Sequence, residues 1–282
     1  MLIRAAMEDF ERYGEMAYVL ALDPGRSSYP TYGDGVKTKA DFLDAARRAV
    51  SGEASELLLF SMDGAVEGWI SYFWLDEDRY LQIDGCNIRR GAERALAELM
   101  DRLEARFAGY AVYFGVPGEN GEAVRFFPSH GFRCAERAWN CVLLFEGYAP
   151  GRGARHVERI SREYFDRFRA VYHAPDDAYW NCDRIYETLE KWTIFVYSEG
   201  EAPAVAVFAT GRGGHFEIFG MEFADGVFRE EALREVLTAL LDECKGAGAK
   251  DMTCFCREVE RRVLRTLGFR CIGEYILYEK KL

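Results

Sequence analysis

A short stretch in the first half of the sequence combines residue types suited to acid–base chemistry and anion binding. Asp84-Gly85-Cys86-Asn87 offers a carboxylate that can accept a proton, with a thiol and an amide beside it. Ile88-Arg89-Arg90-Gly91-Ala92 follows directly. Glycine lets the backbone approach a ligand closely, and the N–H groups of a starting helix hold anions. Asp84 and Cys86 are therefore candidate catalytic residues, although a carboxylate at a strand end is also often solvated or a helix cap.

The second half offers a weaker counterpart of this stretch. Its proton-accepting candidates are Glu217 and Glu222, on the strand before the corresponding connection. The connection itself reads Asp225-Gly226-Val227-Phe228-Arg229-Glu230-Glu231 and places two carboxylates in a first helical turn. That arrangement favours the helix dipole and disfavours phosphate. In the first half, only Glu93 brings a carboxylate into the equivalent position. We therefore expect an anionic ligand in the first half.

A repeated tetrapeptide divides the chain into two related halves. Gly131-Phe132-Arg133-Cys134 recurs as Gly268-Phe269-Arg270-Cys271, and 268 − 131 gives an offset of 137 residues. Upstream apolar positions keep the same offset, so the period indicates a duplicated domain rather than a solenoid. We expect one domain over residues 1–146, a linker over 147–155 that is rich in Gly, Pro and Arg, and a second domain over 156–282.

Each half is predicted to contain the elements β-α-α-β-β-β-α-β-α-β, an α+β domain on a mixed sheet. A long amphipathic helix from about Gly91 to Ala108 follows the candidate site. The segment from Asp23 to Gly35 is dense in turn-forming residues and predicts an irregular loop. The candidate acid–base residues of both halves thus lie on the strand that precedes the long helix.

The stretch after the fifth predicted strand carries the most specific motif. It reads Asn120-Gly121-Glu122-Ala123-Val124-Arg125-Phe126-Phe127-Pro128-Ser129-His130-Gly131-Phe132. It resembles the Asn-x-x-Ala-x-x-Leu-Tyr-x-x-x-Gly-Phe pattern of the GNAT (Gcn5-related N-acetyltransferase) family. The resemblance implies a duplicated GNAT-like acyl-CoA N-acyltransferase fold. It also implies acetyl-CoA as co-substrate, a small amine as acceptor, and a base such as Asp84, acting directly or through water.

The same resemblance implies where the cofactor binds and which residue is missing. Residues Asn87, Ile88, Arg89, Arg90, Gly91 and Ala92 would hold acetyl-CoA together with Asn120 and Phe127. The family commonly places a Tyr before the Gly-Phe turn as the acid for the leaving thiolate. That position is Phe127 in the first half and Leu264 in the second. The sequence therefore predicts an N-acetyltransferase that uses its first half, or alternatively an inactive GNAT-like protein that binds a ligand or a partner.

Composition narrows the classes of partner. The net charge of −11 and the sequence pI of about 5.1 disfavour nucleic acid or an anionic membrane surface as a partner. Such a charge suits a cationic substrate, but it is more commonly explained by solubility alone. Cys254-Phe255-Cys256 has metal-like spacing without an accompanying His or second Cys pair, so we expect no metal. The N-terminus lacks the pattern of a signal peptide and the thiols fit a reducing compartment, so a cytoplasmic location is expected. A homodimer is left open.

Overall fold

The computed structural model describes residues 1–151, 156–174 and 180–282. The chain forms two compact units. The first consists of Met1–Ala138 and Gly273–Leu282, and the second of Trp139–Ile272. These limits differ from the expected domains 1–146 and 156–282, because the end of each half's closing strand belongs to the other unit. Residues 152–155 of the expected linker 147–155 lie outside the described residues.

The first unit has the element order that the sequence predicts. Its elements are β1 (Leu2–Arg4), α1 (Met7–Ala21), α2 (Lys39–Ser51), β2 (Ser55–Met62), β3 (Ala65–Leu75), β4 (Tyr80–Ile88), α3 (Ala92–Arg106), β5 (Ala111–Pro117) and α4 (Gly121–Ser129), with the first part of β6 (Arg133–Leu144) and the last part of β12 (Arg270–Lys281). Its strands lie in the order β1-β2-β3-β4-β5-β12. Of these pairings, only that of β4 with β5 is parallel.

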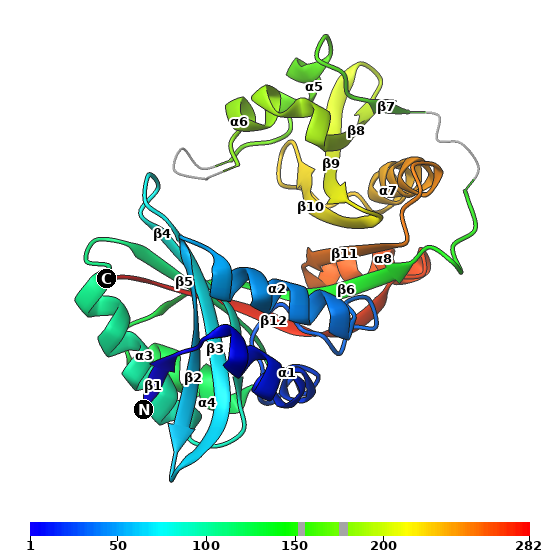
Figure 1. Cartoon of the computed structure of the whole chain (residues 1–282). Coiled ribbons are helices and arrows are strands. Elements are labelled where there is room, and N and C mark those ends of the chain that lie inside the picture. The colour runs from blue at the N-terminus through cyan, green and yellow to red at the C-terminus, as the bar shows by residue number, and fades with distance from the viewer. Residues whose placement is uncertain (152–155, 175–179) are drawn as a thin grey trace. The chain divides into compact units, whose positions relative to one another are not determined.

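Helices cover both faces of this sheet, as Figure 1 shows for α1 and α2 against α3 and α4. Successive residues of a strand point to opposite faces. Leu57 and Leu59 of β2 accordingly pack in a core cluster with residues of α1 and α2. Leu58 and Phe60 pack in the other cluster, with residues of α3 and α4. The sheet is thus buried on both sides, and its edges and strand ends remain for a ligand.

Local sequence signals account for the helices of this unit. In α3 the residues of the predicted apolar stripe are all buried, namely Ala95, Leu96, Leu99, Met100 and Leu103. Before α2, the Thr38 hydroxyl accepts the Asp41 N–H and the Asp41 carboxylate accepts the Thr38 N–H, a reciprocal N-terminal cap. Before α4, the side chain of Asn120 accepts the N–H of Ala123.

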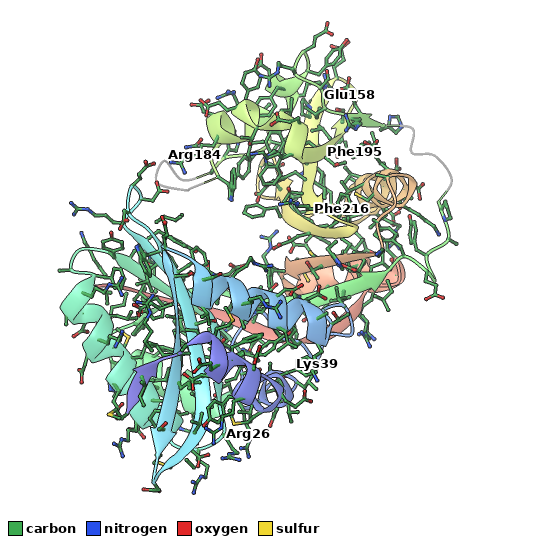
Figure 2. All side chains as sticks on the ribbon, in the orientation of Figure 1. Arg26, Lys39, Glu158, Arg184, Phe195 and Phe216 are labelled. Carbon is green, nitrogen blue, oxygen red and sulfur yellow. The ribbon has the colours of Figure 1, made fainter. Side chains whose placement is uncertain are left out.

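The second unit repeats the plan. Its elements are the last part of β6, β7 (Val157–Arg159), α5 (Phe165–Arg169), α6 (Cys182–Glu187), a 3₁₀ turn (Leu189–Lys191), β8 (Trp192–Glu199), β9 (Ala202–Arg212), β10 (His215–Phe223), α7 (Glu230–Gly246), β11 (Asp251–Cys256), α8 (Glu258–Thr266) and the first part of β12. Its strands lie in the order β6-β11-β10-β9-β8-β7. Phe195 of β8 belongs to the core cluster that includes residues of α7 and α8, and Phe216 of β10 is partly buried and packs against it; Figure 2 labels both.

The closing strands of the two halves are exchanged between the units. β12, from the second half of the sequence, pairs with β5 from Tyr275↔Pro117 to Lys281↔Ala111. β6, from the first half, pairs with β11 from Asp251↔Leu144 to Cys256↔Trp139. Each unit therefore completes its sheet with residues from the other half of the sequence. Within the described ranges, none of the helices combines the length and apolar character that crossing a bilayer requires.

Candidate active site

Two neighbouring parallel strands separate at one end of the first unit's sheet. β4 and β5 pair from Tyr80↔Ala111 to Ile83↔Phe114, while β4 continues beside β3 as far as Gly68↔Ile88. A register shift in the pairing with β3 makes Asp84 the extra residue of a β-bulge. α3 and α4 both begin where these strands end. Carboxyl ends of parallel strands and starts of helices form ligand sites, so this gap is the candidate active site.

A segment from the loop after α1 lies in the gap. The N–H of Ile88 donates to the carbonyl of Arg26 at 3.1 Å, and the N–H of Tyr29 donates to the carbonyl of Gly115 at 2.8 Å. The N–H of Cys86 donates to the Ser28 hydroxyl at 2.7 Å. The segment Arg26–Tyr29 is thus hydrogen-bonded to β4 on one side and to β5 on the other. Figure 2 labels Arg26 at the start of this segment.

Asn120 and Arg89, two residues predicted to bind the cofactor, also contact this segment. The Asn120 amide donates to the carbonyl of Ser27 at 2.9 Å, and Arg26 Nη1 donates to the carbonyl of Arg89 at 2.7 Å. Ser27 and Ser28 are buried. Two residues that were predicted to bind acetyl-CoA, Asn120 and Arg89, therefore form hydrogen bonds with a segment of the chain itself.

A cavity of about 300 Å³ remains beside the segment, between the starts of α3 and α4. Five of the predicted site residues line it, namely Cys86, Ile88, Arg89, Ala92 and Asn120. Arg26 and Arg125 line it too. The sequence reasoning did not single out these two arginines, because nothing local ties residue 26 to residue 89. A second cavity of about 390 Å³ shares Ala92, Glu122 and Arg125 with the first and is also lined by Gly91 and Glu93.

A buried carboxylate neutralises part of the positive charge of this site. Arg89 Nε donates to Glu67 Oε2 at 2.7 Å, and Arg90 Nε donates to Glu67 Oε1 at 3.2 Å. Glu67 lies on β3 and is fully buried. The hydrogen bonds from Arg90 and Arg89 lower the pKa of Glu67 to about 2. Both predicted arginines therefore already have an anionic partner near pH 7.

Gly91 forms the turn that the sequence predicted for the connection between β4 and α3. Its φ of 71° is left-handed, and it is the N-terminal cap of α3. Glycine adopts this conformation without the steric cost of a side chain. β4 ends at Ile88 and α3 begins at Ala92, so the connection has three residues. A Cβ on Gly91 would lie 3.2 Å from the sulfur of Met62.

Asp84 and Cys86 differ in their acid–base character. Burial raises the pKa of Asp84 above its ordinary value, and its Oδ1 is buried without a hydrogen-bond partner among the described residues. Burial, and next the charge of Asp84, raise the pKa of Tyr32 to about 12. Burial also raises the pKa of Cys86 to about 12. Of the two, Asp84 is the better candidate for a proton acceptor, because Cys86 remains a neutral thiol near pH 7.

Four predicted residues line neither cavity, namely Asp84, Asn87, Arg90 and Phe127. Asn87 is buried and sits opposite Trp69 of β3. Arg90 lines neither cavity and is half exposed. Phe127 is fully buried, and its ring packs against Phe114, Phe132 and Tyr278. The position that resembles the family's tyrosine is therefore a core position here.

The second unit separates its strands in the same way but with other side chains. β10 and β11 pair in parallel from His215↔Asp251 to Ile218↔Cys254, and the register shift on β10 makes Phe219 the bulged residue. Phe219 is 41 % exposed and packs edge-on against Trp192. Burial raises the pKa of Glu222. The bulged residue is thus a carboxylate, Asp84, in the first unit and an aromatic residue, Phe219, in the second.

The second unit's connection to its long helix carries its own anion. The Asp225 carboxylate accepts the Val227 N–H at 3.0 Å and two N–H groups of Arg229 at 2.7 Å each. These bonds, that of Arg229 above all, hold the pKa of Asp225 well below its ordinary value. Glu230 and Glu231 begin α7 directly afterwards. In the described ranges of both units, no group of three or more His, Cys, Asp or Glu side chains is placed to hold a metal ion.

Of three comparisons with known proteins, only the comparison with solved structures finds similar proteins. No protein-family model matches the chain, and no curated protein matches it either. A GCN5-related N-acetyltransferase from Sphaerobacter thermophilus is similar with a TM-score of 0.66 and 13 % identity, over 100 % of this chain and 95 % of that one. A tandem GNAT protein from the clavulanic acid biosynthesis pathway is similar with a TM-score of 0.52 and 13 % identity, over 100 % of this chain and 98 % of its own. The chain therefore has the fold of the GNAT N-acetyltransferases, in a tandem arrangement.

Proposed function

We propose that the chain is an N-acetyltransferase that moves an acetyl group from acetyl-CoA to a small amine, and that the first unit carries the reaction. The observation that supports this most directly is the placement of Asp84. Its carboxyl, with a raised pKa, is the bulged residue of β4 where β4 leaves β5. The cavity of about 300 Å³ near this point, which Asp84 itself does not line, has Arg26, Arg89 and Arg125 in its wall together with Glu122.

Asp84 supplies the basic group that amine acetylation needs. An amine is mostly protonated near neutral pH and must lose a proton before, or as, its nitrogen attacks the acetyl carbonyl. A carboxylate whose pKa is raised by burial is a stronger proton acceptor than an exposed one. The C–N bond then forms, the C–S bond breaks and the thiolate of coenzyme A leaves. The net charge of −11 favours the approach of a cationic amine.

The start of α3, the start of α4 and the arginines between them suit the phosphates of the cofactor. N–H groups at helix starts and guanidinium groups both bind phosphate oxygens. Arg125 lines both cavities. The leaving thiolate has no tyrosine nearby at the family position, because Phe127 is a core residue. Water would protonate the thiolate, at a cost of up to about 10²–10⁴-fold in rate.

Titration calorimetry with acetyl-CoA, using two glycine variants, tests this proposal. Gly91→Glu introduces a carboxylate at the cavity under α3, and Gly226→Glu introduces one in the corresponding connection of the second unit. Both glycines have a φ of 71°, so both replacements carry the same left-handed backbone strain. We expect micromolar binding in the wild type, loss in Gly91→Glu and retention in Gly226→Glu. Retention in Gly91→Glu would remove the first unit as the cofactor site.

A non-catalytic ligand-binding role is the second candidate. The segment Arg26–Tyr29 in the gap and the pairing of Arg89 and Arg90 with Glu67 favour it. Under this alternative, no amine causes release of the coenzyme A thiol, even where a ligand raises the melting temperature. A thiol-release assay with a panel of amines and a panel of acyl-CoA donors separates the two roles. It also separates acetyl-CoA from other acyl donors.

A further inference from the structure

The gap between β4 and β5 presents backbone groups that an extended ligand can bind. The N–H groups of Cys86 and Ile88 point away from β3, since both donate to the segment on the β5 side. These two residues are alternate residues of one strand, so the two N–H groups lie roughly 6–7 Å apart. On the other side the carbonyl of Gly115 faces the gap. Unpaired strand edges of this kind bind extended chains through alternate N–H and C=O groups.

The arm of acetyl-CoA that carries the thioester has the matching chemistry. It is an extended chain with two secondary amides, each with one carbonyl acceptor and one N–H donor. Its carbonyls suit the N–H groups of Cys86 and Ile88, and an amide N–H suits the carbonyl of Gly115. The segment Arg26–Tyr29 occupies these same three groups through the Arg26 carbonyl, the Ser28 hydroxyl and the Tyr29 N–H. Segment and arm therefore compete for one set of hydrogen bonds.

We propose that Arg26–Tyr29 is an internal occupant of the acetyl-CoA groove, and that it leaves the gap when the thioester arm of acetyl-CoA enters. This proposal rests on the function proposed above. The proposal explains why the gap beside Asp84 and the two cavities is filled by a segment of the chain itself.

The composition of the segment suits such an exchange. Residues 25–28 are Gly, Arg, Ser and Ser, so they carry no large apolar side chain whose exposure would oppose departure. Asp23 holds the turn before it, because its carboxylate accepts the Gly25 N–H and its carbonyl accepts the Arg26 N–H. Tyr29, by contrast, packs edge-on against Tyr275. The segment can therefore move out as a preformed turn while Tyr29 keeps its ring contact.

Calorimetric titration of a Ser28→Ala variant tests the exchange. The variant removes the hydroxyl that accepts the Cys86 N–H and leaves the backbone of β4 intact. One hydrogen bond fewer in the free state should make acetyl-CoA bind ~3–10-fold more tightly. Ser55→Ala is the matched control, because the Ser55 hydroxyl donates to carbonyls of α2 instead, and its affinity should equal that of the wild type. Equal or weaker binding in Ser28→Ala would overturn the proposal.

Hydrogen exchange on the wild type provides a readout that needs no variant. Saturating acetyl-CoA should speed exchange at the Tyr29 amide, which loses the Gly115 carbonyl. The amides of Cys86 and Ile88 should stay slow, because they change partners. Bound acetyl-CoA with a Tyr29 amide that stays slow would refute the exchange and leave the proposed function standing. Absence of acetyl-CoA binding in both the wild type and Ser28→Ala would refute both.

Discussion

The two units join their diverging strand to the following helix in different ways. In the first unit three residues connect β4 to α3, and their arginines reach a buried carboxylate on β3, Glu67. In the second unit β10 ends at Phe223 and α7 begins at Glu230, a connection of six residues that contains its own carboxylate, Asp225. In the first unit the carboxylate that pairs with the arginines of the connection therefore lies on a neighbouring strand. In the second unit a carboxylate that pairs with the arginine lies within the connection itself.

The position of the carboxylate decides what can still bind at the helix start. An anion within the loop, followed by Glu230 and Glu231, places negative charge where phosphate would lie. In the first unit Glu67 lies on a neighbouring strand, and Arg125 lines both cavities, although Glu122 lines both as well and Glu93 lines the second. The loop carboxylate of the second unit thus supports the proposal that acetyl-CoA binds in the first unit, and single substitutions in each unit test it.

The largest expected effect is on acetyl transfer in Asp84→Asn. Loss of the proton acceptor should lower kcat/KM by about 10²–10⁴-fold, whereas Glu222→Gln in the second unit should leave it near the wild-type value. In the wild type, kcat/KM should fall at low pH as Asp84 becomes protonated, and because its pKa is raised the fall should occur above the ordinary range for Asp. pH–rate profiles of the wild type and of both variants check this. A larger loss in Glu222→Gln would assign the chemistry to the second unit.

Next in size is the effect of a hydroxyl at the family's tyrosine position. Phe127→Tyr should destabilise the first unit by about 1–3 kcal/mol, because the new hydroxyl would be buried among aromatic rings without a partner. It should not speed acetyl transfer. Phe219→Tyr in the second unit is the control and should be close to neutral, since Phe219 is 41 % exposed. Urea unfolding and the transfer assay measure the two effects, and faster transfer in Phe127→Tyr would contradict the core assignment.

A smaller effect is expected for single arginines. Arg125→Ala should weaken acetyl-CoA binding by about 10-fold, the scale of one hydrogen bond to a charged group. Arg229→Ala should have no effect on binding, because that guanidinium pairs with Asp225. Titration at two salt concentrations checks both, with a reduced salt dependence in Arg125→Ala. Equal losses in the two variants would mean that the units share the cofactor.

The smallest effect concerns the buried carboxylate of the first unit. Glu67→Gln should lower the melting temperature by a few degrees at neutral pH, because it removes the anion between Arg89 and Arg90. The pKa of Glu67 is lowered to about 2 in the fold. Its contribution is therefore fully present above the ordinary carboxyl pKa and is lost as the pH falls towards 2. The difference in melting temperature from the wild type should close over that window, and a constant difference would contradict the pairing.

Local sequence signals predicted much of this structure. The element order of both halves, the turn at Gly91 and the cap at Asn120 all follow from periodicity, glycine and capping chemistry within a few residues. The contacts made by residues far apart in the sequence were not predicted. Residues 23–35 were interpreted as an irregular loop, and nothing within them indicates that they reach β4 and β5. The pairing of Glu67 with Arg89 depends on strand register, which composition does not specify.

The strand exchange has a consequence for how the protein is made. The sheet of the first unit needs residues 273–282, and these leave the ribosome after the whole of the second unit has been synthesised. Until then the β5 edge and the apolar residues that pack against Ile276 and Tyr278 have no cover. Nascent chains stalled after residue 272 should therefore expose protease-sensitive sites in residues 1–138, and protection should come with the final strand. Expression of the two halves as separate polypeptides would require each to supply the other's last strand in trans.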